Sequence, residues 1–347
     1  ILPTESEKSE YTDKKKKYDE AKKLLKKYLT LPSVSKDGKQ VEIVGNIGSP
    51  DDVKKVIENG GEGIGLFRTE FLFMDRDCMP TEEEQFESYK QVATAMEGKP
   101  VIIRTLDIGG DKEIPYMGIA QDENPFLGYR AIRLCLDRKD DIYIPQLRAL
   151  LRASAFGNIK IMLPLITSMD EIREAKSLIE NIKAELDEKN IAYNKDIEVG
   201  IMVETAAASL LADLFAKEVD FFSIGTNDLI QYTMSVDRGN VKVANLYSAF
   251  SPAVLRSINR VITEGKKAGI MVGMCGEAAA DPLLVPVLLA WGLDEFSMSA
   301  SSILKSRQIV SLCDSKDLRA KVDKVLEMGC ESEIKDYLKK ISEELGC

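Results

Sequence analysis

The sequence contains no histidine among its 347 residues. This absence excludes Ser-His-Asp and Cys-His catalytic groups, histidine metal ligands and a phosphohistidine carried by the chain itself. The six cysteines lie far apart and form no CxxC pair, so we expect neither a zinc ribbon nor a disulfide framework. A reduced, cytoplasmic protein is the simplest interpretation.

Long apolar runs are also missing. No segment reaches the roughly 18–20 apolar residues of a membrane helix, and residues 1–30 are charged and lysine-rich, unlike a signal peptide. The formal net charge of -10 argues against nucleic acid as the main partner. The chain begins with Ile1 rather than methionine, so we interpret it as a fragment or a processed product.

The sequence does contain eight short apolar runs separated by stretches of helical periodicity. The runs are 41–48, 63–70, 101–109, 159–167, 197–205, 221–228, 271–277 and 295–301. This alternation predicts an α/β protein, a (β/α)8 TIM barrel formed by residues 31–347. A doubly wound open sheet is the competing fold, but its nucleotide-binding versions carry a G-x-G-x-x-G turn that is missing after the first run.

Helices are expected between and around these runs. Residues 1–30 predict a linker helix, either solvated or docking a partner, that ends before Pro32. Thr81 and Ser168 are expected to cap helices, and a helical insertion is expected at about 125–156. Further helices are predicted at 51–59, 169–189, 206–217, 252–268, 282–291 and in the amphipathic tail 302–347.

Arginines stand at the ends of two neighbouring runs. Arg68 and Arg104 close the second and third runs, and Arg238 and Lys112 lie on loops beyond run ends. Because parallel strands of a barrel end at one mouth, these cations are expected to converge there. Guanidinium groups suit phosphate and carboxylate ligands, although each arginine could instead pair with a neighbouring Asp or Glu.

Two carboxylates close the fifth and sixth runs. Glu204 and Asp228 would suit a hard cation such as Mg²⁺, which takes one or two carboxylates plus substrate oxygens and water. The alternative is a carboxylate paired with one of the arginines. Asn227 could donate an amide hydrogen to a ligand oxygen, or could be a turn residue that bonds its own backbone.

Cys275 lies between glycines at the end of the seventh run, in the segment 273–277. It could be core filler, a nucleophile or a proton donor to carbon, and without a histidine to activate it the donor role is favoured over the nucleophile. The other five cysteines are interpreted as structural. A ligand with phosphate, carboxylate, a need for Mg²⁺ and a carbon that accepts a proton would match phosphoenolpyruvate (PEP).

Four motifs resemble the enzyme I family of the bacterial phosphoenolpyruvate:sugar phosphotransferase system. They are GLFRTEFLF at 65–73, IRTLDIGGDK at 103–112, GTNDL at 225–229 with VDR at 236–238, and GMCGE at 273–277. The resemblance covers essentially all of 31–347, and residues 1–30 look like the end of the family's inter-domain linker.

The resemblance implies a barrel that binds PEP and forms a homodimer. It implies that Arg68, Arg104 and Arg238 contact the anionic groups, with Asn227 and Asp228 beside the substrate and Lys112 nearby. It also implies that Glu204 and Asp228 ligate Mg²⁺ and that Cys275 protonates enolpyruvate. In the family, a histidine on an N-terminal domain accepts the phosphoryl group and passes it to the carrier protein HPr.

This sequence departs from the family pattern because it lacks that N-terminal domain. The chain is therefore expected to bind PEP without completing phosphotransfer alone. Smaller departures are Ala206 and Ser251, where many members have proline and histidine.

Two alternative functions remain open at this stage. One is the matching barrel of pyruvate phosphate dikinase or PEP synthase, although the segments 74–77 and 296–300 favour enzyme I. The other is a non-catalytic, ligand-sensing dimerisation module.

Overall fold

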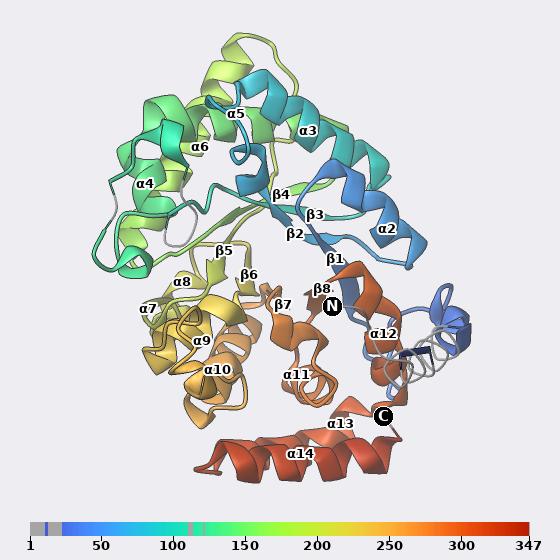
Figure 1. The fold of residues 1–347 in the computed structure, drawn as a ribbon. Helices are drawn as coiled ribbons and strands as arrows, with labels where there is room; N and C mark the ends of the chain where they lie inside the picture. Colours follow the sequence, from blue (N-terminus) through green and yellow to red (C-terminus); the bar gives the residue numbers. More distant parts are fainter. Residues whose placement is uncertain (1–10, 13–22, 110–113, 121, 347) are drawn as a thin grey trace.

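A computed structural model describes residues 11–12, 23–109, 114–120 and 122–346. Eight parallel strands pair in chain order, and β8 pairs back with β1, so the sheet closes into a barrel (Figure 1). The strands are β1 (Glu42–Ile47), β2 (Ile64–Arg68), β3 (Val101–Arg104), β4 (Ile159–Leu163), β5 (Val199–Val203), β6 (Phe221–Ile224), β7 (Met271–Met274) and β8 (Glu295–Met298). Each lies within one predicted run, so the predicted TIM barrel is confirmed.

The strands are buried on both faces, which explains why their sequences are apolar runs and not strict alternations. Every residue of β3 and β5 is buried. The barrel interior is filled by Leu66, Ile102, Met162, Met202, Phe221 and Cys275. A much larger apolar cluster lies between the strands and the surrounding helices. The barrel is therefore a packed core, with Cys275 at the carboxyl end of its interior.

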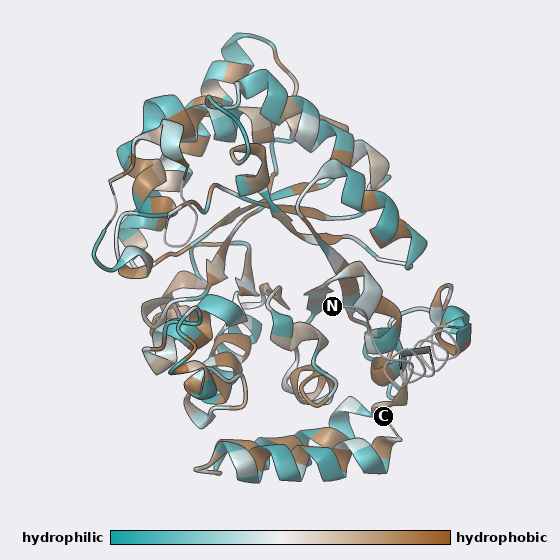
Figure 2. Ribbon diagram, viewed as in Figure 1, coloured by the Kyte–Doolittle hydropathy of each residue, from teal (hydrophilic) through white to brown (hydrophobic). Residues whose placement is uncertain are grey.

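Helices surround the barrel with their apolar residues toward it and their hydrophilic residues outward (Figure 2). They are α2 (Val53–Glu58), α3 (Glu82–Ala95), α4 (Ile132–Asp137), α5 (Ile144–Ala153), α6 (Met169–Glu188), α7 (Ala206–Leu210), α8 (Ala212–Phe215), α9 (Thr226–Met234), α10 (Pro252–Ala268), α11 (Val285–Trp291), α12 (Ile303–Leu312), α13 (Ser315–Val322) and α14 (Glu331–Leu345). In the described part of the chain, no helix is both long enough and apolar enough to cross a membrane.

The predicted helix caps are present. Thr81 accepts a hydrogen bond from the backbone of Glu84, and Ser168 accepts one from Glu171. In each case the glutamate bonds back to the cap residue, which completes a capping box. The predicted insertion between β3 and β4 is also helical, and it contains α4 and α5.

Two predictions about helices and one about a strand were wrong in detail. The helix expected at 206–217 is divided at Leu211 into α7 and α8, and α11 begins at Val285 instead of residue 282. The sixth apolar run was expected to continue to Asp228, but β6 ends at Ile224 and α9 begins at Thr226. Asn227 and Asp228 therefore lie in the first turn of a helix that the sequence did not predict.

Most of the predicted linker helix, residues 1–10 and 13–22, lies outside the described residues. Residues 23–25 are helical, and a 3-10 turn, Lys26–Tyr28, follows them. The buried Arg307 on α12 donates to the carbonyl of Tyr28 at 2.9 Å and to the hydroxyl of Ser33 at 3.0 Å. These bonds attach the beginning of the barrel domain to its last helices.

Candidate active site

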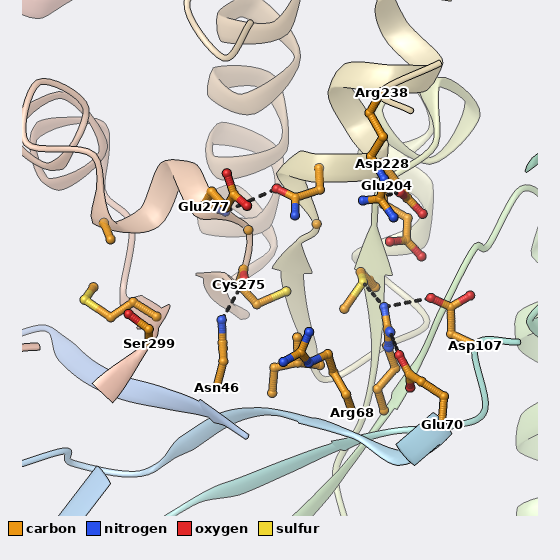
Figure 3. Close-up of a pocket in the computed structure, with 18 of the residues that line it drawn as sticks. Asn46, Arg68, Glu70, Asp107, Glu204, Asp228, Arg238, Cys275, Glu277 and Ser299 are labelled. Atoms are coloured by element: carbon orange, nitrogen blue, oxygen red, sulfur yellow. Dashed lines mark hydrogen bonds and ion pairs between the residues drawn. The ribbon is translucent and has the colours of Figure 1, made fainter. Parts of the chain in front are cut away.

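A cavity of about 610 Å³ lies at the carboxyl ends of the strands (Figure 3). Seven predicted site residues line it: Arg68, Arg104, Glu204, Asn227, Asp228, Arg238 and Cys275. The eighth, Lys112, lies outside the described residues. Segments separated by more than 200 residues in sequence therefore meet in one place, as the parallel strands of a barrel require.

Arg104, the last residue of β3, is buried between two carboxylates. Its Nη2 lies 2.5 Å from Oε1 of Glu70, and its Nη1 lies 3.0 Å from Oδ2 of Asp107. The alternative that this arginine pairs with neighbouring acids therefore holds in the structure. Burial alone would lower the pKa of Arg104, but Asp107 and Glu70 outweigh it and raise the pKa, so the guanidinium stays charged.

Arg68 closes β2 directly beside Arg104, since the two residues are register partners. Its guanidinium lies 5.1 Å from the ring centroid of Phe71. Among the described residues, no carboxylate lies within ion-pair distance of Arg68, whose side chain is exposed at the cavity. This arginine is therefore well suited to receive an anionic ligand.

Asp228 is held between two arginines. Nη2 of Arg130 lies 3.2 Å from one of its carboxylate oxygens, and Nη1 of Arg238 lies 3.4 Å from the other. Arg130 also lies 2.7 Å from Oδ1 of Asp107. The alternative of an acid paired with arginine therefore holds for Asp228 as well, and the polar groups at the mouth form one connected network.

Arg130 was not predicted, because it lies in the insertion and not at the end of a strand. Gly109 allows Arg130 to approach. A Cβ at residue 109 would lie 2.5 Å from the Cβ of Arg130, and the φ of Gly109, 107°, is one that other residues rarely adopt. The following residue, Ala131, has φ at 51°. A positive φ is uncommon for alanine, and such strain, on the order of 1–3 kcal/mol, is concentrated at functional sites in proteins.

Glu204 follows β5 and is almost fully buried. One carboxylate oxygen accepts a hydrogen bond from the backbone of Leu165 at 2.7 Å, and Leu165 also has a positive φ, 55°. Burial, followed by the negative charges of Asp228 and Asp107, raises the pKa of Glu204 to about 8. A proton or a bound cation would relieve this accumulation of negative charge.

The donor set fits Mg²⁺ bound partly through a ligand. Within the described ranges, no three Cys, His, Asp or Glu side chains are grouped so as to hold a metal by themselves. Glu204 and Asp228 nevertheless both line the cavity. Two carboxylates suffice for Mg²⁺ when substrate oxygens and water complete its coordination.

Asn227 lies in the first turn of α9, where its side-chain oxygen accepts a hydrogen bond from the backbone of Glu277 at 3.3 Å. It therefore bonds the turn after β7 and not its own backbone. Because the oxygen is used in this way, the –NH2 group is the end of the amide that can donate to a ligand.

Cys275 follows β7, and 6% of its surface is exposed. Burial raises the pKa of its thiol to about 12, so the sulfur keeps its proton at neutral pH. A protonated thiol is a poor nucleophile but retains a proton to donate. Of the other described cysteines, Cys135 and Cys313 belong to the core, whereas Cys78 and Cys330 are exposed.

Residues 22–315 match the family described as "PEP-utilising enzyme, PEP-binding domain". The chain belongs to this family. The match covers most of the barrel and the motifs that bring the seven residues to the cavity, so the resemblance seen in the sequence is confirmed.

This chain is similar, along almost all of its own length, to proteins named phosphoenolpyruvate-protein phosphotransferase. Identity is 53% over 339 residues with the protein of Priestia megaterium and 52% over 339 residues with that of Bacillus subtilis (strain 168). With that of Staphylococcus carnosus (strain TM300) it is 51% over 338 residues. These alignments cover 97–98% of this chain but only 59% of each relative.

A solved structure shares the fold of this PEP-utilising family member. A citrate lyase from Burkholderia xenovorans LB400 superposes with a TM-score of 0.51 over 91% of this chain and 96% of that one. Sequence identity is 15%, so this likeness concerns the fold alone.

Proposed function

We propose that this chain binds phosphoenolpyruvate together with Mg²⁺ and that it is the PEP-binding part, residues 31–347, of a longer phosphotransferase of the enzyme I type. The observation that carries the proposal is the convergence of Arg68, Arg104, Arg238, Glu204 and Cys275 on one cavity. About 50% identity with phosphotransferases favours enzyme I over the dikinase and synthase alternatives.

Charge balance explains why a metal would be needed. Among the described residues that line the cavity, four arginines (68, 104, 130 and 238) face five carboxylates (70, 107, 204, 228 and 277). Such a cavity gives little net attraction for a multiply charged anion. A divalent cation held by Glu204 and Asp228 would make the local charge positive and would supply coordination positions for the ligand's oxygens.

The arginines and the amide of Asn227 would then orient the substrate. Arg68 is the most accessible cation for its phosphate or carboxylate, with Arg238 on the opposite side of the cavity mouth (Figure 3). The buried Arg104 would contribute a fixed positive charge at the cavity wall. Lys112 remains part of the proposed substrate site. Phosphoryl transfer depends mainly on this kind of positioning and charge neutralisation.

The phosphoryl acceptor must lie outside this sequence, which has no histidine. We propose a histidine on a separate N-terminal domain, which then phosphorylates HPr in a cytoplasmic, homodimeric enzyme at the first step of sugar uptake. In the transfer, the bond between phosphorus and the enol oxygen breaks and a nitrogen–phosphorus bond forms. The electron pair of the broken bond stays on the oxygen, which leaves enolpyruvate as its enolate.

Cys275 would complete the reaction. The enolate carbon takes the proton of the thiol, the oxygen becomes the carbonyl of pyruvate, and a thiolate remains that solvent reprotonates. A thiol that keeps its proton at neutral pH suits this role.

Calorimetry of PEP binding tests the proposed function. The parent chain should bind PEP in Mg²⁺, and binding should weaken at least tenfold in chelator because the cavity then has no net positive charge. Glu204→Gln should bind weakly in both conditions. Equal affinity with and without Mg²⁺ would remove the metal from the proposal, and no binding in either condition would overturn it.

The raised pKa of Glu204 gives Mg²⁺ binding a definite pH dependence. Below about pH 8 the unliganded carboxyl is protonated, so the metal must displace that proton, and affinity should increase as pH rises toward 8. Calorimetry of Mg²⁺ binding to the PEP-saturated chain, in two buffers of different ionisation enthalpy, should show release of close to one proton at pH 7. Release should fall nearly to zero at pH 9.5; constant release across this range would contradict the assignment.

A further inference from the structure

Cys275 lies just beyond the hydrogen-bonded part of its strand. The pairing of β7 with β8 ends at Met274, opposite Phe296. The N–H of Cys275 still donates to the carbonyl of Ile224 on β6, at 3.1 Å. Its carbonyl lies past the end of the strand ladder and needs a partner other than a neighbouring strand.

That partner is Asn46, whose Nδ2 donates to the carbonyl of Cys275 at 3.0 Å (Figure 3). Asn46 belongs to β1, which adjoins β8 and not β7, so its side chain reaches across the end of a whole strand. A carbonyl oxygen can only accept hydrogen bonds, and this fixes which end of the amide faces Cys275.

Ser297 on β8 holds the other end of the amide. Its hydroxyl donates to Oδ1 of Asn46 at 2.5 Å and is completely buried. Gly65 on β2 provides the space for this hydroxyl, because a Cβ at residue 65 would lie 2.4 Å from it. Strands β8 and β1 therefore supply a short chain of hydrogen bonds that ends at the backbone of Cys275, and β2 leaves the space for it.

The turn after Cys275 is fixed from the other side as well. A Cβ at Gly276 would lie 1.8 Å from the hydroxyl oxygen of Thr226, so the turn is pressed against the start of α9. Asn227 accepts the N–H of Glu277 in the same helical turn. Asn46 is the counterpart on the barrel side, and without it one face of the turn would lose its restraint.

We propose that Asn46, oriented by Ser297, is a positioning residue that fixes the direction in which the Cys275 thiol delivers its proton. Asn46 lines the cavity, but one N–H and the oxygen of its amide are both engaged by the protein, and we assign it the role of holding the turn. The proposal rests on the proposed function, in which Cys275 protonates enolpyruvate. A displacement of about 1 Å can reduce such a step by on the order of a hundredfold.

The test replaces Asn46 with leucine, which has a similar shape and can neither donate nor accept. With a histidine-bearing N-terminal domain supplied, kcat for pyruvate formation should fall about 10- to 100-fold, whereas the PEP dissociation constant should change less than threefold. Ser297→Ala should act in the same direction more weakly. Asn59→Asp is the control. It removes a bond of the same kind, from the amide of Asn59 after the end of α2 to the carbonyl of Lys55, and it should leave kcat and the PEP dissociation constant unchanged.

Stereochemistry separates positioning from a general structural defect. The (Z)-methyl analogue of PEP, turned over in D2O, gains a CHD carbon whose configuration reports the face that received the deuteron. The unsubstituted chain should give a single enantiomer, and Asn46→Leu should give a mixture. Iodoacetamide labelling of Cys275, followed by peptide mass spectrometry, should speed up several-fold in the variant. Unchanged kcat, a single enantiomer and unchanged labelling would overturn the proposal. The labelling rate reports the position of Cys275 whether or not PEP binds. If the unsubstituted chain bound no PEP, the proposed function would be refuted, and the labelling result would still test the role of Asn46.

Discussion

Replacing Arg104 with alanine should abolish detectable PEP binding and also destabilise the barrel by about 3–5 kcal/mol. The guanidinium lies at ion-pair distance from Glu70 and Asp107, and all three side chains are buried. Its removal would leave two buried carboxylates without this counterion and would make the cavity more negative. Calorimetry with PEP and Mg²⁺, together with urea unfolding of the same sample, would measure the two effects.

Two other arginines separate these effects. Arg68→Ala should weaken PEP binding about 10- to 100-fold with little change in stability, because Arg68 is exposed and has no acidic partner among the described residues. Arg260→Ala removes an exposed pair with Asp213 and bonds to the carbonyls of Ser209 and Leu210, and it should lower stability by no more than about 1–2 kcal/mol. Wild-type PEP affinity in Arg104→Ala would exclude Arg104 from the ligand site.

Replacing Cys275 with alanine should leave PEP binding nearly unchanged but slow pyruvate formation about 10²- to 10⁴-fold once a histidine domain is supplied. Loss of the thiol removes the proton and not the charges that hold the substrate. Rapid quench would follow the phosphohistidine, and a coupled assay would follow pyruvate. Phosphoryl transfer should continue to a first turnover while the ketone appears slowly.

Serine at the same position is the matched comparison. A hydroxyl is a far weaker acid than a thiol, so Cys275→Ser should resemble Cys275→Ala and not the parent. Cys313→Ala, in the core but away from the cavity, should retain normal turnover if the variant folds. Normal turnover in Cys275→Ala would rule out the proton-donor role.

The strands were predictable because burial on both faces leaves a simple signature. In β5, all five residues of Val199–Val203 are buried, and the sequence there is uninterrupted by charge. The ends of the strands were less predictable. The run expected to continue to Asp228 instead turns at Gly225 into α9, because a short polar segment such as 226–228 can end a strand or begin a helix.

The cavity residues were predictable only in part. A barrel gathers the residues that follow its strands, so Arg68, Arg104, Glu204 and Cys275 could be placed together from sequence order alone. Arg130 could not, because it reaches the same cavity from an insertion, through a close approach at Gly109. Nor could the pairing of Arg104 with Glu70, which depends on side-chain packing at the ends of two strands.

A crystal structure of this chain with PEP and Mn²⁺, a Mg²⁺ substitute with an anomalous signal, tests the central claim most directly. The account predicts the metal on Glu204 and Asp228, the anionic groups of PEP within hydrogen-bond distance of Arg68, and the methylene carbon facing the sulfur of Cys275. A ligand bound away from this cavity, or a metal bound to neither carboxylate, would contradict it.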